Sequence, residues 1–151
     1  MVGAGPAYVD TSAYVKIYDS RESASKQFSE RIGEVRTVAS LLLLAETQSA
    51  FARKFREGDV DAQGLARLRS KLRRDWNRVL KIRLTDQVLA ETERLIFRYD
   101  LRAADSIHLA SATLVRNRLG GGLPIITADQ KMASAAATEG FQVEHFGLLR
   151  T

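Results

Sequence analysis

The sequence predicts a single α/β domain, in which a mostly parallel sheet of about five short strands is flanked by helices on both faces. Its 151 residues, 45% of them hydrophobic and 27% charged, are enough for one globular domain with a real core. Short apolar runs alternate with segments of helical periodicity, which is the pattern of a parallel sheet covered on both sides. No internal repeat, low-complexity tract or linker divides the chain. We therefore expect one domain over residues 1–151, with residues 1–6 as a flexible tail.

The expected elements follow one another from the N-terminus as strands and helices in turn. Strands are predicted where a short run is apolar or β-branched. Helices are predicted where apolar residues recur three or four apart until a glycine stops the pattern. The predicted strands are residues 7–10, 35–39, 79–84, 124–127 and 141–146. The predicted helices are one that ends at residue 18 and those over residues 22–32, 40–56, 67–78, 85–99, 103–119 and 129–138.

Positive charge is concentrated in one segment. The chain has a formal net charge of +5, but residues 53–83 alone hold eleven Lys and Arg against four Asp and Glu, so the remainder is mildly acidic. The helix over residues 67–78 carries an apolar stripe, which must pack on the helix over residues 40–56 or on a partner. Its other faces are basic, which favours an anionic partner, nucleic acid ahead of membrane, or else a solvated surface. The candidate RNA contacts are Arg69, Arg73 and Arg74.

The composition excludes several kinds of chemistry. With no cysteine, the chain can form neither a disulfide nor a thiolate nucleophile nor a Cys-ligated metal site, and it suits the reducing cytoplasm, where we expect it. Two histidines leave little room for a His-rich zinc site. The longest apolar run, residues 41–45, is far too short to span a bilayer, and the first residues lack the pattern of a secretory signal. Any catalysis must therefore use carboxylates, hydroxyls or the backbone.

Four acidic residues stand where a purely structural role explains them poorly. Asp10 ends the first strand and Asp129 follows the fourth, so both are expected at the carboxyl edge of the sheet, where ligands bind. Helix capping is the alternative for each. Glu46 lies on a largely apolar helix stripe, either as a ligand for a cation or as half of a buried ion pair with an arginine. Asp105 lies on the inward stripe of its helix, in the first turn, where the helix dipole favours an acid.

Together the four acids predict a metal site. Several carboxylates close together cannot all ionise unless positive charge is supplied, and all-oxygen ligation suits Mg²⁺ or Mn²⁺. Mg²⁺ held by carboxylates acts mostly on phosphates, and the basic segment would hold a polyanionic substrate. Both features indicate phosphodiester cleavage.

Four segments resemble the PIN-domain family, in order and along essentially the whole chain. They are YVDTSAYVKIY, SLLLLAETQSAF, LRAADSIHLASA and IITADQKMASAAATEGFQV, of which LRAADSIHLA is the most specific. Their spacing looks most like that of the VapC-type toxins of bacterial type II toxin–antitoxin modules. The resemblance implies a PIN-like fold and an endoribonuclease that depends on Mg²⁺ or Mn²⁺.

The resemblance also implies roles for individual residues and for partners. Asp10 and Asp105 would be the most direct metal ligands, and Asp129 would support the metal or its waters. Glu46 would complete the acidic tetrad by tuning the site or positioning water. The hydroxyls expected to orient these carboxylates, with helix capping as the alternative, are Thr11, Ser12 and Thr127. The implied partners are an RNA substrate, a cognate antitoxin that blocks the acidic site, and a second copy in a homodimer, with no membrane.

Two other interpretations fit the same residues. A housekeeping PIN nuclease would act in RNA maturation or decay without an antitoxin. A catalytically silent RNA-binding module would keep its acids for structure, although an intact tetrad argues against it. His108 and His145 suggest a two-histidine ribonuclease, but one lies within a helix and the other in the last strand. We therefore expect packing or surface roles for both histidines.

Overall fold

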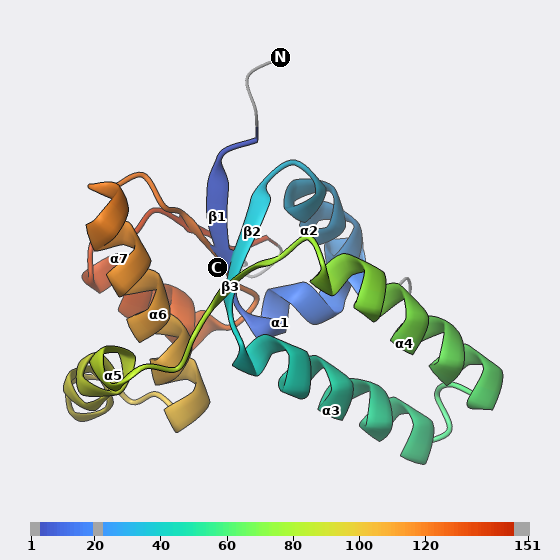
Figure 1. The fold of residues 1–151 in the computed structure, drawn as a ribbon. Coiled ribbons are helices and arrows are strands. Elements are labelled where there is room, and N and C mark those ends of the chain that lie inside the picture. Colours follow the sequence, from blue (N-terminus) through green and yellow to red (C-terminus); the bar gives the residue numbers. More distant parts are fainter. Residues whose placement is uncertain (1–3, 20–22, 147–151) are drawn as a thin grey trace.

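Five short strands pair in parallel to form the predicted sheet. The structure, a computed structural model, describes residues 4–19 and 23–146. The strands lie in the order β3-β2-β1-β4-β5, and every pairing between neighbours is parallel (Figure 1). They are β1 (Pro6–Val9), β2 (Arg36–Ser40), β3 (Leu80–Ile82), β4 (Ile125–Ile126) and β5 (Val143–Glu144). The α/β prediction is thus confirmed, and the sheet is parallel throughout.

Helices cover both faces of this sheet. They are α1 (Thr11–Tyr14), the 3₁₀ helix η1 (Val15–Tyr18), α2 (Ser23–Gly33), α3 (Leu42–Arg56), α4 (Ala62–Trp76), α5 (Asp86–Arg98), α6 (Ala103–Leu119) and α7 (Gln130–Thr138). Figure 1 shows α5, α6 and α7 on one side of the strands and α1 to α4 on the other. None of the helices in the described part of the chain is long and apolar enough to cross a bilayer.

The two helical layers create two cores, because successive residues of a strand point to opposite faces of the sheet. Tyr8 pairs in register with Val38 on β2 and with Ile125 on β4. These three side chains pack toward α5, α6 and α7. The strand residues that pack toward α1 to α4 are Ala7, Val9, Ala39 and Ile126. The tyrosine at the centre of the first core is one of the largest fully buried side chains and contributes to the site described below.

The structure differs from the prediction mainly at element ends. The first helix tightens into η1 after a single α-helical turn, and the Tyr18 hydroxyl there donates to Asp75 on α4 at 2.7 Å. Of the expected tail, residues 1–3 lie outside the described residues, whereas Pro6 already belongs to β1. The last two strands shorten to two residues each.

The basic helix, α4, packs within the chain. Its Leu72 is 2% exposed and joins the core cluster that contains Phe51 of α3, with Leu65, Leu68 and Trp76 packed against it. Of the two possibilities for the apolar stripe, packing on the preceding helix is therefore the one found. The arginines remain on the outer faces of α4.

Candidate active site

Two of the predicted acids lie at the carboxyl ends of adjacent strands. Asp10 directly follows β1, and Asp129 lies shortly after β4, the parallel neighbour of β1. Each is also a helix cap. Asp10 accepts a hydrogen bond from the Ala13 N–H at 3.1 Å. Asp129 accepts one from the Met132 N–H at 2.9 Å. Capping and a position at the ligand-binding edge coexist here, because each helix begins where a strand has just ended.

Asp10 is almost completely enclosed, with an exposed fraction of 2%. The Thr127 hydroxyl donates to its Oδ2 at 2.6 Å, and the Ser12 hydroxyl donates to its Oδ1 at 2.7 Å. Burial raises the pKa of Asp10 above its usual value, and these hydrogen bonds oppose the rise. Among the described residues, no Lys or Arg forms an ion pair with this carboxylate. Asp10 is therefore a buried acid held mainly by hydroxyls.

Glu46, on α3, is held by two donors on one oxygen. The Thr11 hydroxyl donates to Oε1 at 2.8 Å, and Nε2 of His108 lies 2.6 Å from the same atom. Burial by itself raises the pKa of Glu46, but the hydrogen bonds from His108 and from the Thr11 hydroxyl hold this pKa below its usual value. Its partner is thus a histidine of α6, and the alternative of a buried pair with an arginine is not what the structure contains. The carboxylate is 32% exposed and keeps contact with solvent.

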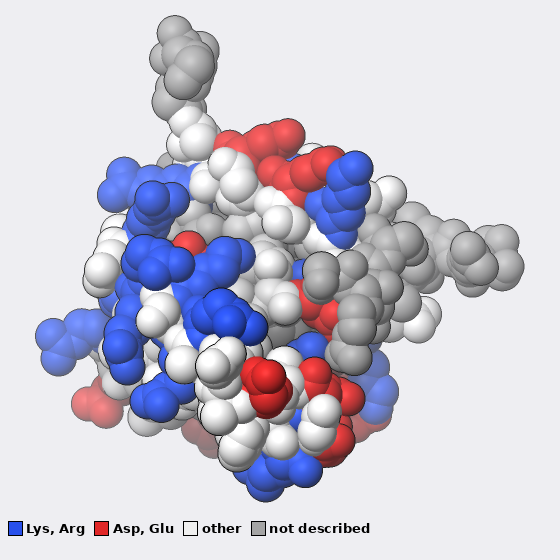
Figure 2. Space-filling view, turned by 90° about the vertical axis from the view of Figure 1, so that its right-hand side faces the viewer, with Lys and Arg blue, Asp and Glu red and all other residues white. Residues whose placement is uncertain are grey.

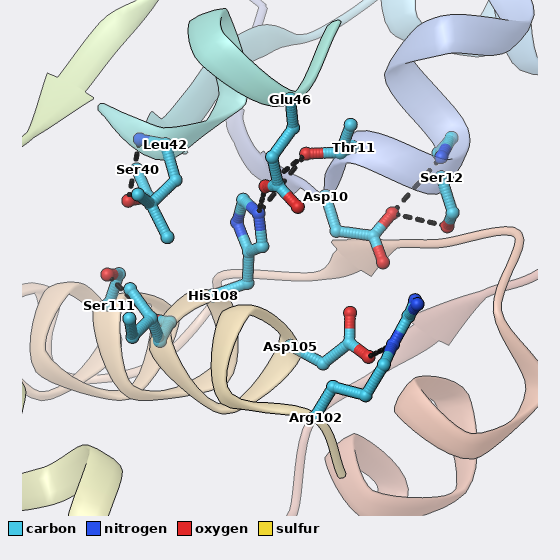
Figure 3. A network of polar contacts seen from close by, with 12 residues as sticks. Asp10, Thr11, Ser12, Ser40, Leu42, Glu46, Arg102, Asp105, His108 and Ser111 are labelled. Carbon is cyan, nitrogen blue, oxygen red and sulfur yellow. Dashed lines mark hydrogen bonds and ion pairs between the residues drawn. The ribbon is translucent and has the colours of Figure 1, made fainter. Parts of the chain in front are cut away.

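Asp105 projects from the first turn of α6 toward the same place. Figure 3 shows its carboxyl group facing that of Asp10, with Glu46 and His108 beside them. Burial raises the pKa of Asp105, the negative charge of Asp129 adds to the rise, and Arg102 opposes it. The Arg102 Nε donates to Asp105 at 3.3 Å from a side chain that is 85% exposed. The four acids therefore come from four separate elements to one end of the sheet.

The donor chemistry fits a hard divalent cation, although the side chains do not enclose one as they stand. The described residues include no group of three or more acidic or histidine side chains gathered closely enough to hold a metal ion. The available donors are carboxylate oxygens, which Mg²⁺ and Mn²⁺ prefer. Among the described residues, no Lys or Arg forms an ion pair with Asp10, and Asp105 pairs with the exposed Arg102.

His108 is a residue of this site that the sequence did not place there. It was expected to have a packing or surface role, and it is indeed buried, with 1% of its side chain exposed. Both ring nitrogens nevertheless make polar contacts, Nδ1 with Tyr8 and Nε2 with Glu46. The signal was the spacing: His108 lies three residues after Asp105 and thus on the same face of the helix. His145 lies beyond β5 and takes no part in this site.

The predicted hydroxyls all contact the acids. Ser12 and Thr127 bind Asp10, and Thr11 binds Glu46. Thr127 also accepts a hydrogen bond from the Asp129 N–H at 3.1 Å, so its hydroxyl connects Asp129, after β4, to Asp10, after β1. These hydroxyls fix the orientation of the carboxylates, as groups next to metal-binding acids commonly do.

Comparison with known proteins agrees with this arrangement. Two curated relatives, Ribonuclease VapC45 and Ribonuclease VapC49 of Mycobacterium tuberculosis, are each 28% identical over 136 residues, which is 90% of this chain and 92% of theirs. VapC20 of the same organism is similar in structure, with a TM-score of 0.64 at 15% identity over 89% of this chain and 95% of that one. A toxin–antitoxin complex from Klebsiella pneumoniae gives a TM-score of 0.60 at 23% identity over 84% and 90% of the two chains. At such identities the solved structures support the fold alone.

The family itself is decided by a match that spans most of the chain. Residues 7–137 match the PIN domain. This stretch begins in the first strand, ends in α7 and contains all four acids of the site. The chain therefore belongs to the PIN-domain family.

Proposed function

We propose that this protein is an endoribonuclease toxin of a toxin–antitoxin system that hydrolyses RNA phosphodiester bonds with Mg²⁺ or Mn²⁺. The observation that carries the proposal is that three carboxylates from separate elements lie at the same end of the sheet as the buried Asp10, which has no ion-pair partner among the described residues. An uncompensated buried carboxylate is costly, and a divalent cation would remove that cost. The VapC relatives, named as ribonucleases, support the choice of substrate.

In this proposal the four acids have different roles. Asp10, Asp105 and Asp129 would hold the ion, which supplies charge stabilisation at the phosphate and a more acidic bound water. Glu46 would position water: both of its donors bind Oε1, and no described residue donates to Oε2. Ser12 and the other hydroxyls on Asp10 would keep that carboxylate in the orientation that it has in the structure.

The basic surface of α4 would bind the RNA backbone. Figure 2 shows a broad patch of Lys and Arg on this face of the molecule. Arg69, Arg73 and Arg74 of α4 are exposed, and none of them forms an ion pair in the described part of the chain. Such arginines release counterions when they meet phosphates, so they contribute affinity without sequence specificity.

The proposed protein partners are a cognate antitoxin and a second copy of this chain. Similar solved structures include a toxin–antitoxin complex and VapBC2 of Rickettsia felis bound to promoter DNA, the latter with a TM-score of 0.62 at 14% identity. Support for self-association comes from α5, where Leu89, Ile96 and Phe97 share one face and Phe97 is 85% exposed.

The proposal is tested by RNA cleavage with the purified chain. Total cellular RNA is incubated with the protein and Mn²⁺ or Mg²⁺, with and without excess EDTA. Asp105→Asn serves as the inactive variant, and Asp86→Asn, an exposed acid in the first turn of α5, is the matched control. We expect cleavage by the wild type and Asp86→Asn only with metal, and none by Asp105→Asn. Undiminished cleavage in EDTA refutes the metal mechanism, and an absence of cleavage under all conditions refutes the nuclease.

A further inference from the structure

A continuous chain of hydrogen bonds runs from the core of the sheet to Glu46. The Tyr8 hydroxyl accepts a hydrogen bond from the Ser40 N–H at 3.1 Å. The same hydroxyl lies 2.8 Å from Nδ1 of His108, whose Nε2 lies 2.6 Å from Glu46 Oε1. Tyr8 and His108 are each 1% exposed, so solvent does not compete for these contacts. The chain therefore connects the backbone of β2 to an acid of the proposed site.

The donors in this series of hydrogen bonds determine which atoms of Tyr8 and His108 carry a proton. The Ser40 N–H can only donate, so the Tyr8 oxygen accepts there and has its own proton to give. A tyrosine hydroxyl keeps its proton at neutral pH, because its ordinary pKa is about 10. Nδ1 of His108, 2.8 Å away, can accept that proton. With Nδ1 accepting, the neutral ring carries its proton on Nε2, which faces the Glu46 carboxylate.

We propose that Tyr8 and His108 are positioning residues that act through Glu46. Tyr8 selects the Nε2–H tautomer of His108, and this N–H, with the Thr11 hydroxyl, holds Oε1. The second oxygen of Glu46 is thereby presented to water in a fixed orientation. This inference rests on the proposed function for its catalytic consequence, but the tautomer and the hydrogen bonds do not depend on it.

A purely structural role of His108 would have different consequences from a positioning role. A buried histidine that serves only packing needs partners for its two nitrogens, and its loss lowers stability without acting on one acid. A positioning role makes the effect of His108 conditional on Glu46, because without the carboxylate there is nothing left to orient. If the effects of substitutions at positions 46 and 108 on kcat are not additive in free energy, His108 has a positioning role; if they are additive, its role is structural.

The kinetic experiment measures kcat for RNA cleavage in five variants. His108→Leu removes the donor, whereas His108→Gln keeps an amide N–H near the position of Nε2. Thr113→Val is the control, since Thr113 is a buried polar residue of α6 whose hydroxyl bonds only to Leu109 O within its own helix. The remaining two variants are Glu46→Gln alone and the combination of His108→Leu with Glu46→Gln.

We expect His108→Leu to lower kcat by roughly 10- to 100-fold, the usual effect of losing a supporting partner, with RNA affinity unchanged. His108→Gln should recover most of this loss, and Thr113→Val should keep the wild-type kcat. The double variant should be no slower than Glu46→Gln alone. Multiplicative losses in the double variant, or equal losses for Leu and Gln at position 108, overturn the inference.

A second measurement determines the protonation of the His108 ring and requires no RNA. Nitrogen-15 NMR distinguishes a protonated ring nitrogen from an unprotonated one, and we expect His108 in the wild type to carry its proton on Nε2 at neutral pH. Tyr8→Phe removes the donor to Nδ1 and should shift the tautomer balance toward Nδ1–H. A proton on Nδ1 in the wild type, or an unchanged tautomer in Tyr8→Phe, overturns the inference. If the Nε2–H tautomer is found in a chain that cleaves no RNA, the hydrogen-bond chain stands and the nuclease proposal fails.

Discussion

Glu46→Gln is the substitution whose effect on stability follows most directly from the structure. Glu46 Oε1 accepts hydrogen bonds from His108 at 2.6 Å and from Thr11 at 2.8 Å. A hydrogen bond to a charged group contributes about 1.5–3 kcal/mol and one between neutral groups about 0.5–1.5 kcal/mol. The glutamine oxygen can accept both bonds, so the variant loses about 1 kcal/mol per bond. Relief of repulsion from the neighbouring acids offsets part of this, which leaves an expected loss of about 1–2 kcal/mol at neutral pH.

The loss of unfolding free energy in Glu46→Gln should depend on pH. The folded pKa of Glu46 is lower than its usual 4.5, so the ionised carboxylate stabilises the fold above that pH. The contribution disappears as the pH falls through the lowered folded pKa, where the wild type also becomes neutral. Urea denaturation of the metal-free protein, carried out from pH 7 down through the titration of Glu46, measures the difference in unfolding free energy.

Asp105→Asn is the control, because its effect on stability at pH 7 should have the opposite sign. The folded pKa of Asp105 is raised, so its ionised form is disfavoured in the folded chain and costs stability as the pH rises from its usual 3.8 through the folded value. Asp105→Asn should therefore be at least as stable as the wild type at pH 7. A Glu46→Gln variant as stable as the wild type at pH 7, or a deficit that persists unchanged in acid, would refute the reasoning.

Three further outcomes are expected. Asp105→Asn should lose more activity than the roughly 10- to 100-fold that loss of a supporting residue costs, with its circular dichroism unchanged, and cleavage near the wild-type rate would contradict its role as a ligand. The triple variant Arg69→Gln, Arg73→Gln and Arg74→Gln should bind RNA less tightly and flatten the log–log salt dependence by about 2, since each contact with a single strand contributes about 0.7. An unchanged slope would mean that α4 is a solvated surface. Arg102→Gln should tighten Mn²⁺ binding by about 1.5- to 5-fold, because an exposed ion pair on Asp105 is worth about 0.2–1 kcal/mol, and weaker binding would exclude Arg102 as a competitor.

The sequence predicted the elements whose signals are local. The helix over residues 103–119 has the predicted bounds, and its end is set locally by Gly120, which adopts the left-handed conformation with a φ of 74°. Asp10 and Asp129 could be placed at one edge because both follow strands of a parallel sheet. The break of the first helix into η1 could not be predicted, since η1 is anchored by the contact of Tyr18 with Asp75, far away in the chain.

The hydrogen bonds within the site join residues that are far apart in the sequence. His108 touches Tyr8, which lies 100 residues earlier, and the two meet because α6 packs on the face of β1 that Tyr8 points to. Helical spacing placed His108 beside Asp105, but nothing in the sequence showed what its ring would bind. The pairing of Arg102 with Asp105 was local, at three residues, and went unnoticed because an exposed arginine near a helix start has no distinctive pattern.

The central claim, that the acids around Asp10 bind a divalent cation, is tested most directly by titrating the metal-free protein with Mn²⁺. Calorimetry gives the dissociation constant and the number of ions for the wild type, for Asp10→Asn and for the control Asp86→Asn. The account predicts saturable binding by the wild type and the control, and at least a 10-fold weaker association in Asp10→Asn, because the variant loses a carboxylate ligand. Equal binding by Asp10→Asn and the wild type would contradict it.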